Sequence, residues 1–362
     1  MSLLLNVKTE GPKYIGSKEK LIPYILFLAR QIKFKTIFDG FSGTTRVSQA
    51  FAKLGYKVIA NDIAIWSKVF GYCYLINKKD RNYYKPIIDY LNSLEGKFGW
   101  FSENYGGDPK RGDSKKPWQI HNTMKLDAIR EEIDKITNDE IEKSVLLTSL
   151  ILALDKVDNT IGHFSSYLRD WSKRSYKNLK LEVPNLIISD VEHEVYNEDI
   201  FKLLDKIEAD LSYLDPPYGS NNDKMPPSRV RYQAYYHIWT TIIKNDKPEL
   251  FGNSKRRYDS SDKISYSPFE DFRKDDNGKF IAEIAIEQLI KRIKSQYIIF
   301  SYSTNGRVPI KNLIEIFSSY CRILKVLEIN YKKNVMSYMT WTNKWVNNNE
   351  NKELLFLMEK IK

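Results

Sequence analysis

The sequence of 362 residues contains only two cysteines, Cys73 and Cys321, and four histidines scattered along the chain. Two cysteines cannot build a disulfide framework, and isolated histidines lack the spacing of a zinc site, so we expect no metal. No apolar run is long enough to cross a bilayer, and the amino-terminal residues lack the basic start and long apolar core of a signal peptide. These absences predict a cytoplasmic protein with no membrane partner.

Acidic residues are also in short supply, because 46 Asp and Glu stand against 57 Lys and Arg and leave a net charge of +11. An excess of positive charge attracts polyanions over a long range, and nucleic acid is the polyanion considered first. The same excess keeps many proteins in solution, so charge alone does not decide between the two interpretations. The 24 tyrosines offer rings for stacking wherever they alternate with basic residues.

The first 65 residues have the spacing of a strand–helix–strand unit that a further helix precedes. Apolar residues recur at helical intervals in the two helical segments, whereas the two strand segments are short and apolar. We expect a helix over 17–32 capped by Ser17, strands over 36–38 and 56–62, and a second helix over 47–54.

A glycine-bearing turn, 39–45, follows the first strand, and Asp62 ends the second. In a doubly wound sheet both positions lie at the carboxyl ends of the strands, where ligands bind. Gly43 lets the backbone approach a ligand, and a terminal acid suits the hydroxyls of a ribose. Because the full glycine fingerprint of a dinucleotide site is missing, we expect a nucleoside without a pyrophosphate. An ordinary turn with a solvated aspartate is the alternative.

The rest of the chain divides into a helical middle and an alternating carboxyl-terminal part. The alternation predicts an open, mostly parallel sheet with helices on both faces, and its last two strands are close enough for a hairpin-like edge. We expect helices over 126–136, 141–154, 200–207, 280–293 and 310–320, and strands over 186–189, 211–214, 296–301, 323–331 and 354–358.

The most informative motif is Asp215-Pro216-Pro217-Tyr218, which follows the apolar run 211–214. Proline lacks an N–H and fixes φ, so two prolines in succession end a strand and turn the chain outward. The carboxylate of Asp215 and the carbonyl of Pro216 are then two adjacent acceptors, followed by the flat ring of Tyr218. This combination suits the binding of a planar amino group, and a simple strand-ending turn is the alternative.

Four motifs in this order resemble those of one family, the alpha-group, Dam-like DNA adenine-N6 methyltransferases. They are the run Lys-Tyr-Ile-Gly-Ser-Lys at 13–18, the loop 38–43, Asp62 and the tetrad 215–218. The run Arg-Tyr-Gln-Ala-Tyr-Tyr-His at 231–237 is similar to the Arg-x-Tyr…Asn-Tyr-His pattern that follows the tetrad in that family. The resemblance covers 11–65 and 186–330. Two residues depart from the family pattern in the loop: Thr45 replaces a glycine and Gly40 a proline.

The resemblance implies S-adenosylmethionine as the cofactor and assigns roles to the residues that match. Lys13, Gly16 and Lys18 match the motif that holds the methionine part of the cofactor. Asp62 matches the acid that binds the ribose, and Asp199 the acid beside the adenine ring. The matches in the glycine-bearing loop are Phe38, Asp39, Phe41, Gly43 and Thr44.

The resemblance also implies an α/β fold, namely a doubly wound, mostly parallel, seven-stranded Rossmann-like methyltransferase sheet. A mainly helical target-recognition domain would be inserted into it. On this basis the catalytic and cofactor-binding domain comprises 1–65 and 186–362, and the insertion comprises 66–185. The segment 219–279 would be an extended loop near the active site.

The implied reaction is site-specific methylation of the exocyclic amino group of a flipped adenine in double-stranded DNA, as part of a restriction-modification system. Asp215 and Pro216 would accept the two amino hydrogens, Pro217 would complete the turn, and Tyr218 would stack on the base. Whether a cognate restriction endonuclease acts on the same site is left open. The alternatives are an amino-cytosine DNA methyltransferase and a catalytically silent DNA-binding protein.

Basic and aromatic residues alternate in two segments that we expect to contact DNA. One segment lies in the helical insertion and the other follows the tetrad. Each residue is equally compatible with a solvated surface position. The residues are Arg169, Lys173, Arg174, Tyr176, Arg229, Arg231, Tyr232 and Tyr235.

Overall fold

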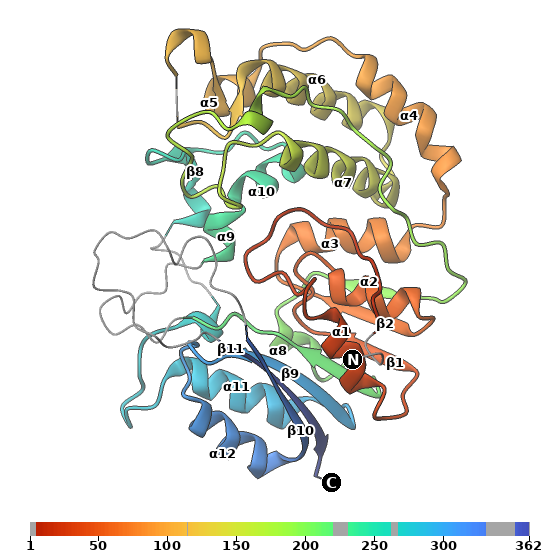
Figure 1. Ribbon diagram of the computed structural model, residues 1–362, viewed down its shortest axis with the longest axis vertical. Coiled ribbons are helices and arrows are strands. Elements are labelled where there is room, and N and C mark those ends of the chain that lie inside the picture. Colours follow the sequence, from red (N-terminus) through yellow and green to blue (C-terminus); the bar gives the residue numbers. More distant parts are fainter. Residues whose placement is uncertain (1–4, 114, 220–230, 262–266, 331–351, 362) are drawn as a thin grey trace.

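The computed structural model of the protein describes residues 5–113, 115–219, 231–261, 267–330 and 352–361 (Figure 1). A seven-stranded sheet runs through its lower part, in the order β10-β11-β9-β6-β1-β2-β5. The five strands from β9 to β5 are parallel, whereas β11 pairs antiparallel with both β9 and β10. The strands are β1 (Thr36–Asp39), β2 (Lys57–Asn61), β5 (Glu194–Tyr196), β6 (Leu211–Leu214), β9 (Tyr297–Ser303), β10 (Cys321–Asn330) and β11 (Lys352–Lys360). The expected seven-stranded, mostly parallel sheet with an antiparallel edge is confirmed.

Neighbouring residues of the central strands pack in two separate hydrophobic cores, because successive side chains of a strand point to opposite faces of the sheet. Ile37 and Tyr213 pack on the face covered by the amino-terminal helices. Phe38 and Leu214 pack on the other face. The first face carries α1 (Ile22–Ala29), α2 (Arg46–Lys53) and α3 (Ile65–Gly71), and the second carries α8 (Ile200–Leu203), α11 (Ile281–Arg292) and α12 (Ile310–Tyr320).

A second helical layer lies beyond the first face, at the top of Figure 1. Its long helices α6 and α7 bury apolar side chains that join the core of the first face. The helices of this layer are α4 (Arg81–Ser93), α5 (Trp100–Tyr105), α6 (Ile120–Ile136), α7 (Glu140–Lys156), α9 (Tyr232–Tyr235) and α10 (His237–Lys244). Short elements complete the fold: a π-helical turn (Tyr72–Ile76), 3₁₀ turns (Pro109–Arg111, Lys173–Tyr176, Tyr258–Ser260, Pro268–Glu270) and the two-residue strands β3 (Gly106–Gly107), β4 (Trp118–Gln119), β7 (Leu250–Phe251) and β8 (Arg256–Arg257).

Three sequence-based expectations about elements are wrong. Residues 186–189 form no strand, and the edge strand β5 lies later, at Glu194–Tyr196. Ser17 does not cap the first helix, which begins at Ile22 after Leu21. The extended loop expected over 219–279 is helical at 232–235 and 237–244, and these helices belong to the upper layer. Arg130 of α6 fixes them there, because its guanidinium donates to the carbonyls of Ile242 and Ile243.

Both cysteines are buried and unpaired. Within the described ranges, none of the helices combines the length and the apolar composition that crossing a bilayer requires.

We expect Gly71→Ala to destabilise the protein, although alanine ordinarily favours a helix over glycine. Gly71 ends α3, and a Cβ there would lie 2.8 Å from Cγ1 of Val195 in β5. Overpacking of this kind costs roughly 1–3 kcal/mol. Urea denaturation followed by circular dichroism would measure the loss of unfolding free energy.

The double variant Gly71→Ala/Val195→Ala is the control for this contact. Shortening Val195 removes the γ-carbons that the new methyl group meets, so the double variant should lose less than the sum of the two single variants. Strictly additive losses would show that these two side chains do not compete for the same space.

Candidate active site

Three acidic residues meet at the carboxyl edge of the sheet, each at the end of a different parallel strand. Asp39 ends β1, Asp62 follows β2 and Asp215 follows β6. The strand order reverses between β1 and β6, which is where ligands bind in sheets of this kind. The sheet therefore brings the predicted cofactor loop and the predicted catalytic tetrad to one place.

Asp215 belongs to a buried polar cluster whose members come from distant parts of the chain. The Lys18 ammonium lies 3.1 Å from Oδ1 of Asp215 and 3.0 Å from Oε1 of Glu353, which lies near the start of β11. The Tyr218 hydroxyl lies 2.5 Å from the same Asp215 oxygen and also hydrogen-bonds Glu353. The Ser301 hydroxyl donates to Glu353 at 2.8 Å. All of these contacts to Asp215 use one oxygen, Oδ1.

The second oxygen of Asp215 and the carbonyl of Pro216 accept no hydrogen bond from any residue in the described part of the chain. The Asp215 side chain is 14% exposed. The turn that presents both acceptors is held in place, because the Tyr218 carbonyl accepts the backbone N–H of Arg307 at 2.7 Å and the hydroxyl of Tyr302 at 3.3 Å. The tetrad thus offers two unoccupied acceptors on a fixed turn.

Burial and neighbouring charges shift the pKa values of the groups in this cluster. Burial raises the pKa of Asp215 to about 6, while Lys18 opposes that shift and Glu353 adds to it. Burial alone would lower the pKa of Lys18, but the two carboxylates outweigh it and raise that pKa above its ordinary value. Burial and the same carboxylates also raise the pKa of Tyr218. At neutral pH the cluster therefore holds an ammonium group, a neutral phenol and an ionised Asp215.

The ring of Tyr218 already has two neighbours. The Lys18 ammonium lies 4.7 Å from its centre, and the ring of Tyr302 lies 4.8 Å away at an angle of 52°. The stacking of Tyr218 on a flipped base stays a prediction.

The turn after β1 is attached to the end of β2 through Asp62. Its Oδ2 accepts the N–H of Gly43 at 2.8 Å, and its Oδ1 accepts that of Ala64 at 2.9 Å. Gly43 has φ +51°, and a Cβ on it would lie 3.4 Å from the ring of Tyr14. Glycine thus leaves a space between the loop and this ring, and the Asp62 carboxylate retains lone pairs beside it.

Thr45 keeps the loop in the shape that a glycine would allow. It has φ +60°, which is uncommon for a β-branched residue, and it is fully buried. Its N–H donates to the carbonyl of Ser42 at 2.6 Å, and its hydroxyl accepts the amide of Gln49 at 3.2 Å. The departure from the family glycine therefore leaves the turn intact.

Asp39 is a buried acceptor at the centre of this edge. It is 1% exposed, its Oδ2 accepts the Ser48 hydroxyl at 2.6 Å, and its Oδ1 has no partner among the described residues. Burial raises the pKa of Asp39 to about 7, against the bond from Ser48, which lowers it. A buried carboxyl oxygen without a donor is unusual and fits a place where a ligand donates.

The other predicted cofactor residues fall into two groups. Phe38 is fully buried in the core, so its side chain supports the loop and cannot contact a ligand, and Thr44 is also buried. Phe41 is half-buried and packs edge-on against Phe269 at 5.2 Å. Asp199 caps α8 with one carboxylate oxygen. Cofactor contacts of Phe41 and Asp199 stay predictions.

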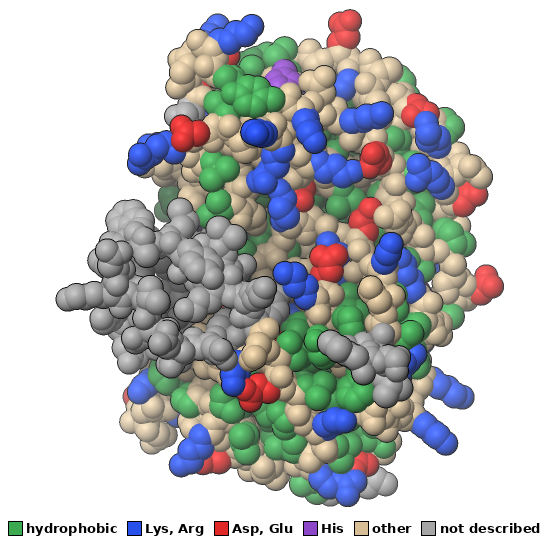
Figure 2. Space-filling view, in the orientation of Figure 1, with side chains coloured by type: hydrophobic (Ala, Val, Ile, Leu, Met, Phe, Trp, Pro, Cys, Tyr) green, Lys and Arg blue, Asp and Glu red, His purple; other side chains and the backbone are tan. Residues whose placement is uncertain are grey.

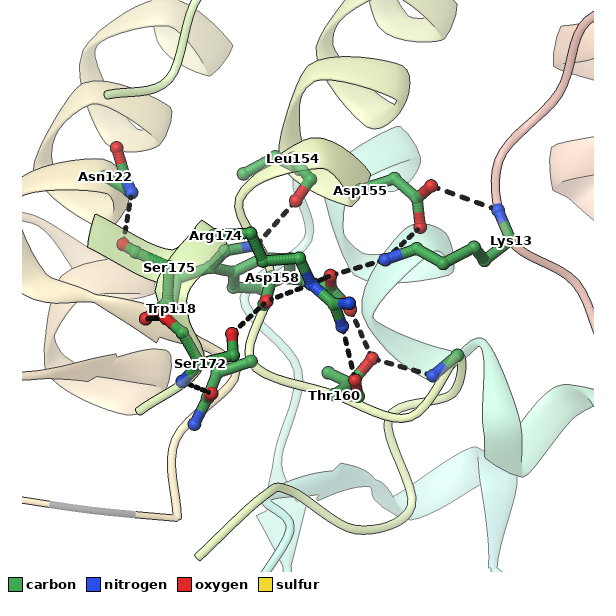
Figure 3. A network of polar contacts seen from close by, with 12 residues as sticks. Lys13, Trp118, Asn122, Leu154, Asp155, Asp158, Thr160, Ser172, Arg174 and Ser175 are labelled. Carbon is green, nitrogen blue, oxygen red and sulfur yellow. Dashed lines mark hydrogen bonds and ion pairs between the residues drawn. The ribbon is translucent and has the colours of Figure 1, made fainter. Parts of the chain in front are cut away.

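The two lysines of the 13–18 run have different partners, and neither ammonium group is free. Lys18 joins the Asp215 cluster. The Lys13 ammonium lies 2.6 Å from Oδ1 of Asp158, and its backbone N–H donates to Asp155 at 3.1 Å (Figure 3). Because both amines are paired with protein carboxylates, this arrangement does not favour their predicted contact with the methionine part of the cofactor.

Between these lysines, Tyr14 enters a stack of aromatic rings. Its ring lies 5.2 Å from that of Tyr232 and 4.5 Å from that of Tyr236, which itself stacks on Trp239 at 4.3 Å. Gly16 has φ +82°, and a Cβ on it would lie 2.7 Å from the Tyr232 hydroxyl. The run 231–237, matched from its sequence, thus packs directly on the amino-terminal motif.

The residues of the insertion that are predicted to contact DNA differ in their exposure and in their contacts within the protein. Arg169, Lys173 and Tyr176 are exposed, Tyr176 by 58%. Arg174 is engaged within the protein, because its Nε lies 2.8 Å from Oδ1 of Asp158 and its guanidinium also donates to the carbonyl of Thr160 (Figure 3). Arg174 therefore stabilises this loop in the structure.

Of the predicted contacts after the tetrad, Tyr235 is buried. It is 7% exposed and stacks on His163 at 4.4 Å, so its ring belongs to the core of the helical layer. Arg231 and Tyr232 are half-buried. Arg229 lies outside the described residues.

Basic side chains gather across the middle of the face shown in Figure 2. A groove of about 500 Å³ lies between the amino-terminal segment and the helical layer. Asp155 and Glu182 also line it, so its charge is mixed. Its basic residues are Lys13, Lys156, Arg174, Lys177 and Lys180.

Sequence reasoning missed three side chains of the site: Tyr14, Ser301 and Glu353. Tyr14 lies within a matched motif, and the tyrosines at 232 and 236 are the signal that could have indicated its stack. Glu353 lies 135 residues after Tyr218, at the start of an apolar strand, and no local pattern marks it.

Residues 14–299 match the model of the family described as D12 class N6 adenine-specific DNA methyltransferase. Modification methylase StsI of Streptococcus sanguinis is 28% identical to this chain over 340 residues, which are 89% of the chain and 48% of StsI. Modification methylase LlaI of Lactococcus lactis subsp. lactis is 27% identical over 325 residues, or 84% of the chain and 48% of LlaI. The chain thus spans about half the length of these relatives.

A third relative has nearly the length of this chain. Type II methyltransferase M.NlaIII of Neisseria lactamica is 28% identical over 316 residues, which are 85% of the chain and 88% of M.NlaIII. The family match extends from Tyr14 through the insertion and the tetrad into β9, so it includes Asp39, Asp62 and Asp215. The resemblance inferred from the motifs is confirmed, and the chain belongs to the D12 class N6 adenine-specific DNA methyltransferase family.

Proposed function

We propose that the protein methylates the exocyclic amino group of adenine in double-stranded DNA at one short sequence, with S-adenosylmethionine as the methyl donor. The observation that carries this proposal is the pair of unoccupied acceptors on the tetrad, Oδ2 of Asp215 and the carbonyl of Pro216. An amino group has two hydrogens to donate, and the tetrad presents two acceptors beside the cofactor loop.

The amino nitrogen of adenine is a poor nucleophile, because its lone pair is delocalised into the ring. If Asp215 and the Pro216 carbonyl each accept one of its hydrogens, the nitrogen can become pyramidal and its lone pair becomes available. Fixed acceptors do this without reorganising during the reaction, which is how preorganised sites stabilise a transition state. The base must first leave the duplex, at a cost of a few kcal/mol.

The residues at the ends of β1 and β2 fit S-adenosylmethionine. Asp62 has lone pairs for ribose hydroxyls, Gly43 leaves room beside Tyr14, and Asp39 has a buried oxygen that suits a donor such as the amino group of the methionine part. When bound, S-adenosylmethionine supplies a methyl group on a positively charged sulfur, which needs no further activation.

DNA would lie against the groove and the exposed residues of the 169–177 segment. Lys173 and Lys177 are exposed, and they flank Tyr176 on the same segment. Phosphate contacts by such residues would position the duplex, whereas base contacts would select the sequence. The names of the relatives, which include modification methylases and a type II methyltransferase, support a role in a restriction-modification system, in which an endonuclease of the same specificity is the expected partner.

Expression in cells that lack adenine methylation, followed by long-read sequencing, tests the proposed function as a whole. Methylated adenines confined to one short motif would support it. Unmethylated DNA from cells that contain the folded protein would contradict it.

Asp215→Ala should lower methyl transfer by at least about 100-fold, because it removes one of the two acceptors for the amino group. Transfer of a radiolabelled methyl group to DNA measures the loss. Titration calorimetry with S-adenosylmethionine should give an affinity close to that of the wild type. Asp205→Ala, at an exposed ion pair with Arg292, is the matched control and should leave transfer unchanged.

The rate of methyl transfer should fall as the pH drops through about 6. Burial raises the pKa of Asp215 to about 6, so below that pH the carboxylate gains a proton and no longer accepts the amino hydrogen. The rate should then fall about tenfold per pH unit. Burial also raises the pKa of Asp39 to about 7, so Asp39 could cause a similar loss of rate, and Asp39→Asn is the control. If the acid limb of the rate profile stays near pH 6 in this variant, the limb reports Asp215.

Lys173→Ala/Lys177→Ala should weaken DNA binding and reduce its salt dependence. Each lost phosphate contact lowers the slope of log K against log salt by roughly 0.9. Fluorescence anisotropy with a labelled duplex at several salt concentrations measures the slope. The matched control is Lys291→Ala/Lys311→Ala on α11 and α12, on the other face of the sheet. Equal slopes for the two double variants would place the DNA elsewhere.

A further inference from the structure

Glu353 is a buried carboxylate that the tetrad mechanism does not use. It lies near the start of β11, where it pairs in register with Ser303 of β9, and its side chain is 9% exposed. Buried acids are rare unless they are paired. Its partners are Lys18, Tyr218 and Ser301, so it shares two of them with Asp215.

The cluster places two carboxylates beside a single positive charge and a single phenol proton. Lys18 provides one positive charge and lies within 3.1 Å of both carboxylates. The Tyr218 hydroxyl has one proton and reaches an oxygen of each, so it can donate to only one at a time. Asp215 and Glu353 therefore share the charge of Lys18 and compete for the Tyr218 proton.

We infer that Glu353 is a positioning residue of the methyl-transfer site, which shares Lys18 and Tyr218 with Asp215 and thereby keeps Asp215 a strong acceptor. The catalytic part of this inference rests on the proposed function. The electrostatic part, that Glu353 changes the charge around Asp215, concerns the protein alone. If Lys18 and the Tyr218 hydroxyl interacted with Asp215 alone, they would largely neutralise its negative charge. Asp215 would then attract an amino hydrogen only weakly. Division of these donors between two carboxylates leaves negative charge on Asp215.

The same sharing fixes the direction of Asp215. Lys18 and Tyr218 both contact Oδ1 of Asp215, Glu353 contacts both of these donors, and Ser301 contacts Tyr218 and Glu353. The carboxylate is therefore anchored through one oxygen while Oδ2 stays free within the described part of the structure. Without Glu353, Lys18 would have Asp215 as its only carboxylate partner in this cluster.

Other ionisable groups act on the pair and bear on any titration. They lie on the amino-terminal segment, β1, β6, the tetrad turn and α9. They are Lys18, Asp39, Tyr213, Tyr218 and Tyr232.

Glu353→Gln tests the inference, because it preserves the size of the side chain and removes its charge. The titration midpoint of Asp215 should fall by roughly one unit, since a like charge is lost and Lys18 acts on Asp215 alone. Carbon-13 NMR of protein labelled at aspartate carboxyl groups measures it without substrate, with the signal assigned from its absence in Asp215→Asn. In methylation assays kcat should fall by about tenfold, and its acid limb should move to lower pH by the same amount as the midpoint.

Glu359→Gln is the matched control, because it makes the same change on the same strand at an exposed ion pair with Arg322. It should leave both the midpoint and kcat as in the wild type. Glu353→Asp retains the charge and should keep the titration midpoint of Asp215 close to the wild-type value. This variant separates the effect of charge from that of side-chain shape, and it remains available as a test if Glu353→Gln does not fold.

An unchanged Asp215 midpoint in Glu353→Gln would overturn the inference, whatever the activity. A lowered midpoint in a protein whose wild type methylates no DNA would retain the electrostatic role and refute the proposed function instead. A lowered kcat without a shifted acid limb would assign Glu353 a structural role only, and would also overturn the inference.

Discussion

A single buried ammonium group joins the three parts of the chain on which the site depends. Lys18 comes from the amino-terminal segment, Asp215 from the end of the central strand β6, and Glu353 from β11 near the far edge of the sheet. Removal of one partner from a buried ion pair commonly costs roughly 3–5 kcal/mol, because it leaves an uncompensated charge. The cluster therefore constrains the fold as well as the chemistry, since the tetrad turn cannot shift without exposing or isolating one of these charges.

The sheet explains how such distant residues meet. β9 lies between β6 and β11, so Ser301 of β9 bridges the tetrad and Glu353. Parallel strands place Asp39, Asp62 and Asp215 at one edge, and the antiparallel β11 brings its first residues to that same edge. A residue at the start of β11 is thus equivalent in position to residues at the ends of the parallel strands.

The sequence was a good guide where the structure is local and apolar. β1, β2 and β6 are short runs of buried residues beside turn signals, and the matched motifs identified the ends of all three. The edge strand β5 was missed because its three residues are only half-buried and pair with one neighbour, whereas the apolar run at 186–189 packs on the core without forming a ladder. Apolar content marks burial, and a strand also needs a partner.

Within the site, the sequence could indicate residue types but not which charges pair. The 13–18 run matches a cofactor motif, and yet its two lysines contact carboxylates in two different parts of the chain. Lys13 reaches Asp155 and Asp158 at the end of α7, and Lys18 reaches Asp215. Such pairings depend on tertiary contacts between residues about 140 to 200 positions apart, which no local pattern encodes.

The 13–18 run therefore connects three regions of the structure. Lys13 holds the loop that carries Arg174, because both side chains bind Asp158 (Figure 3). Tyr14 lies beside Gly43 and stacks on Tyr236, and Lys18 pairs with the carboxylate of Asp215. The short segment from Lys13 to Lys18 thus links the helical layer to the cluster around Asp215 and lies beside the loop that carries Gly43.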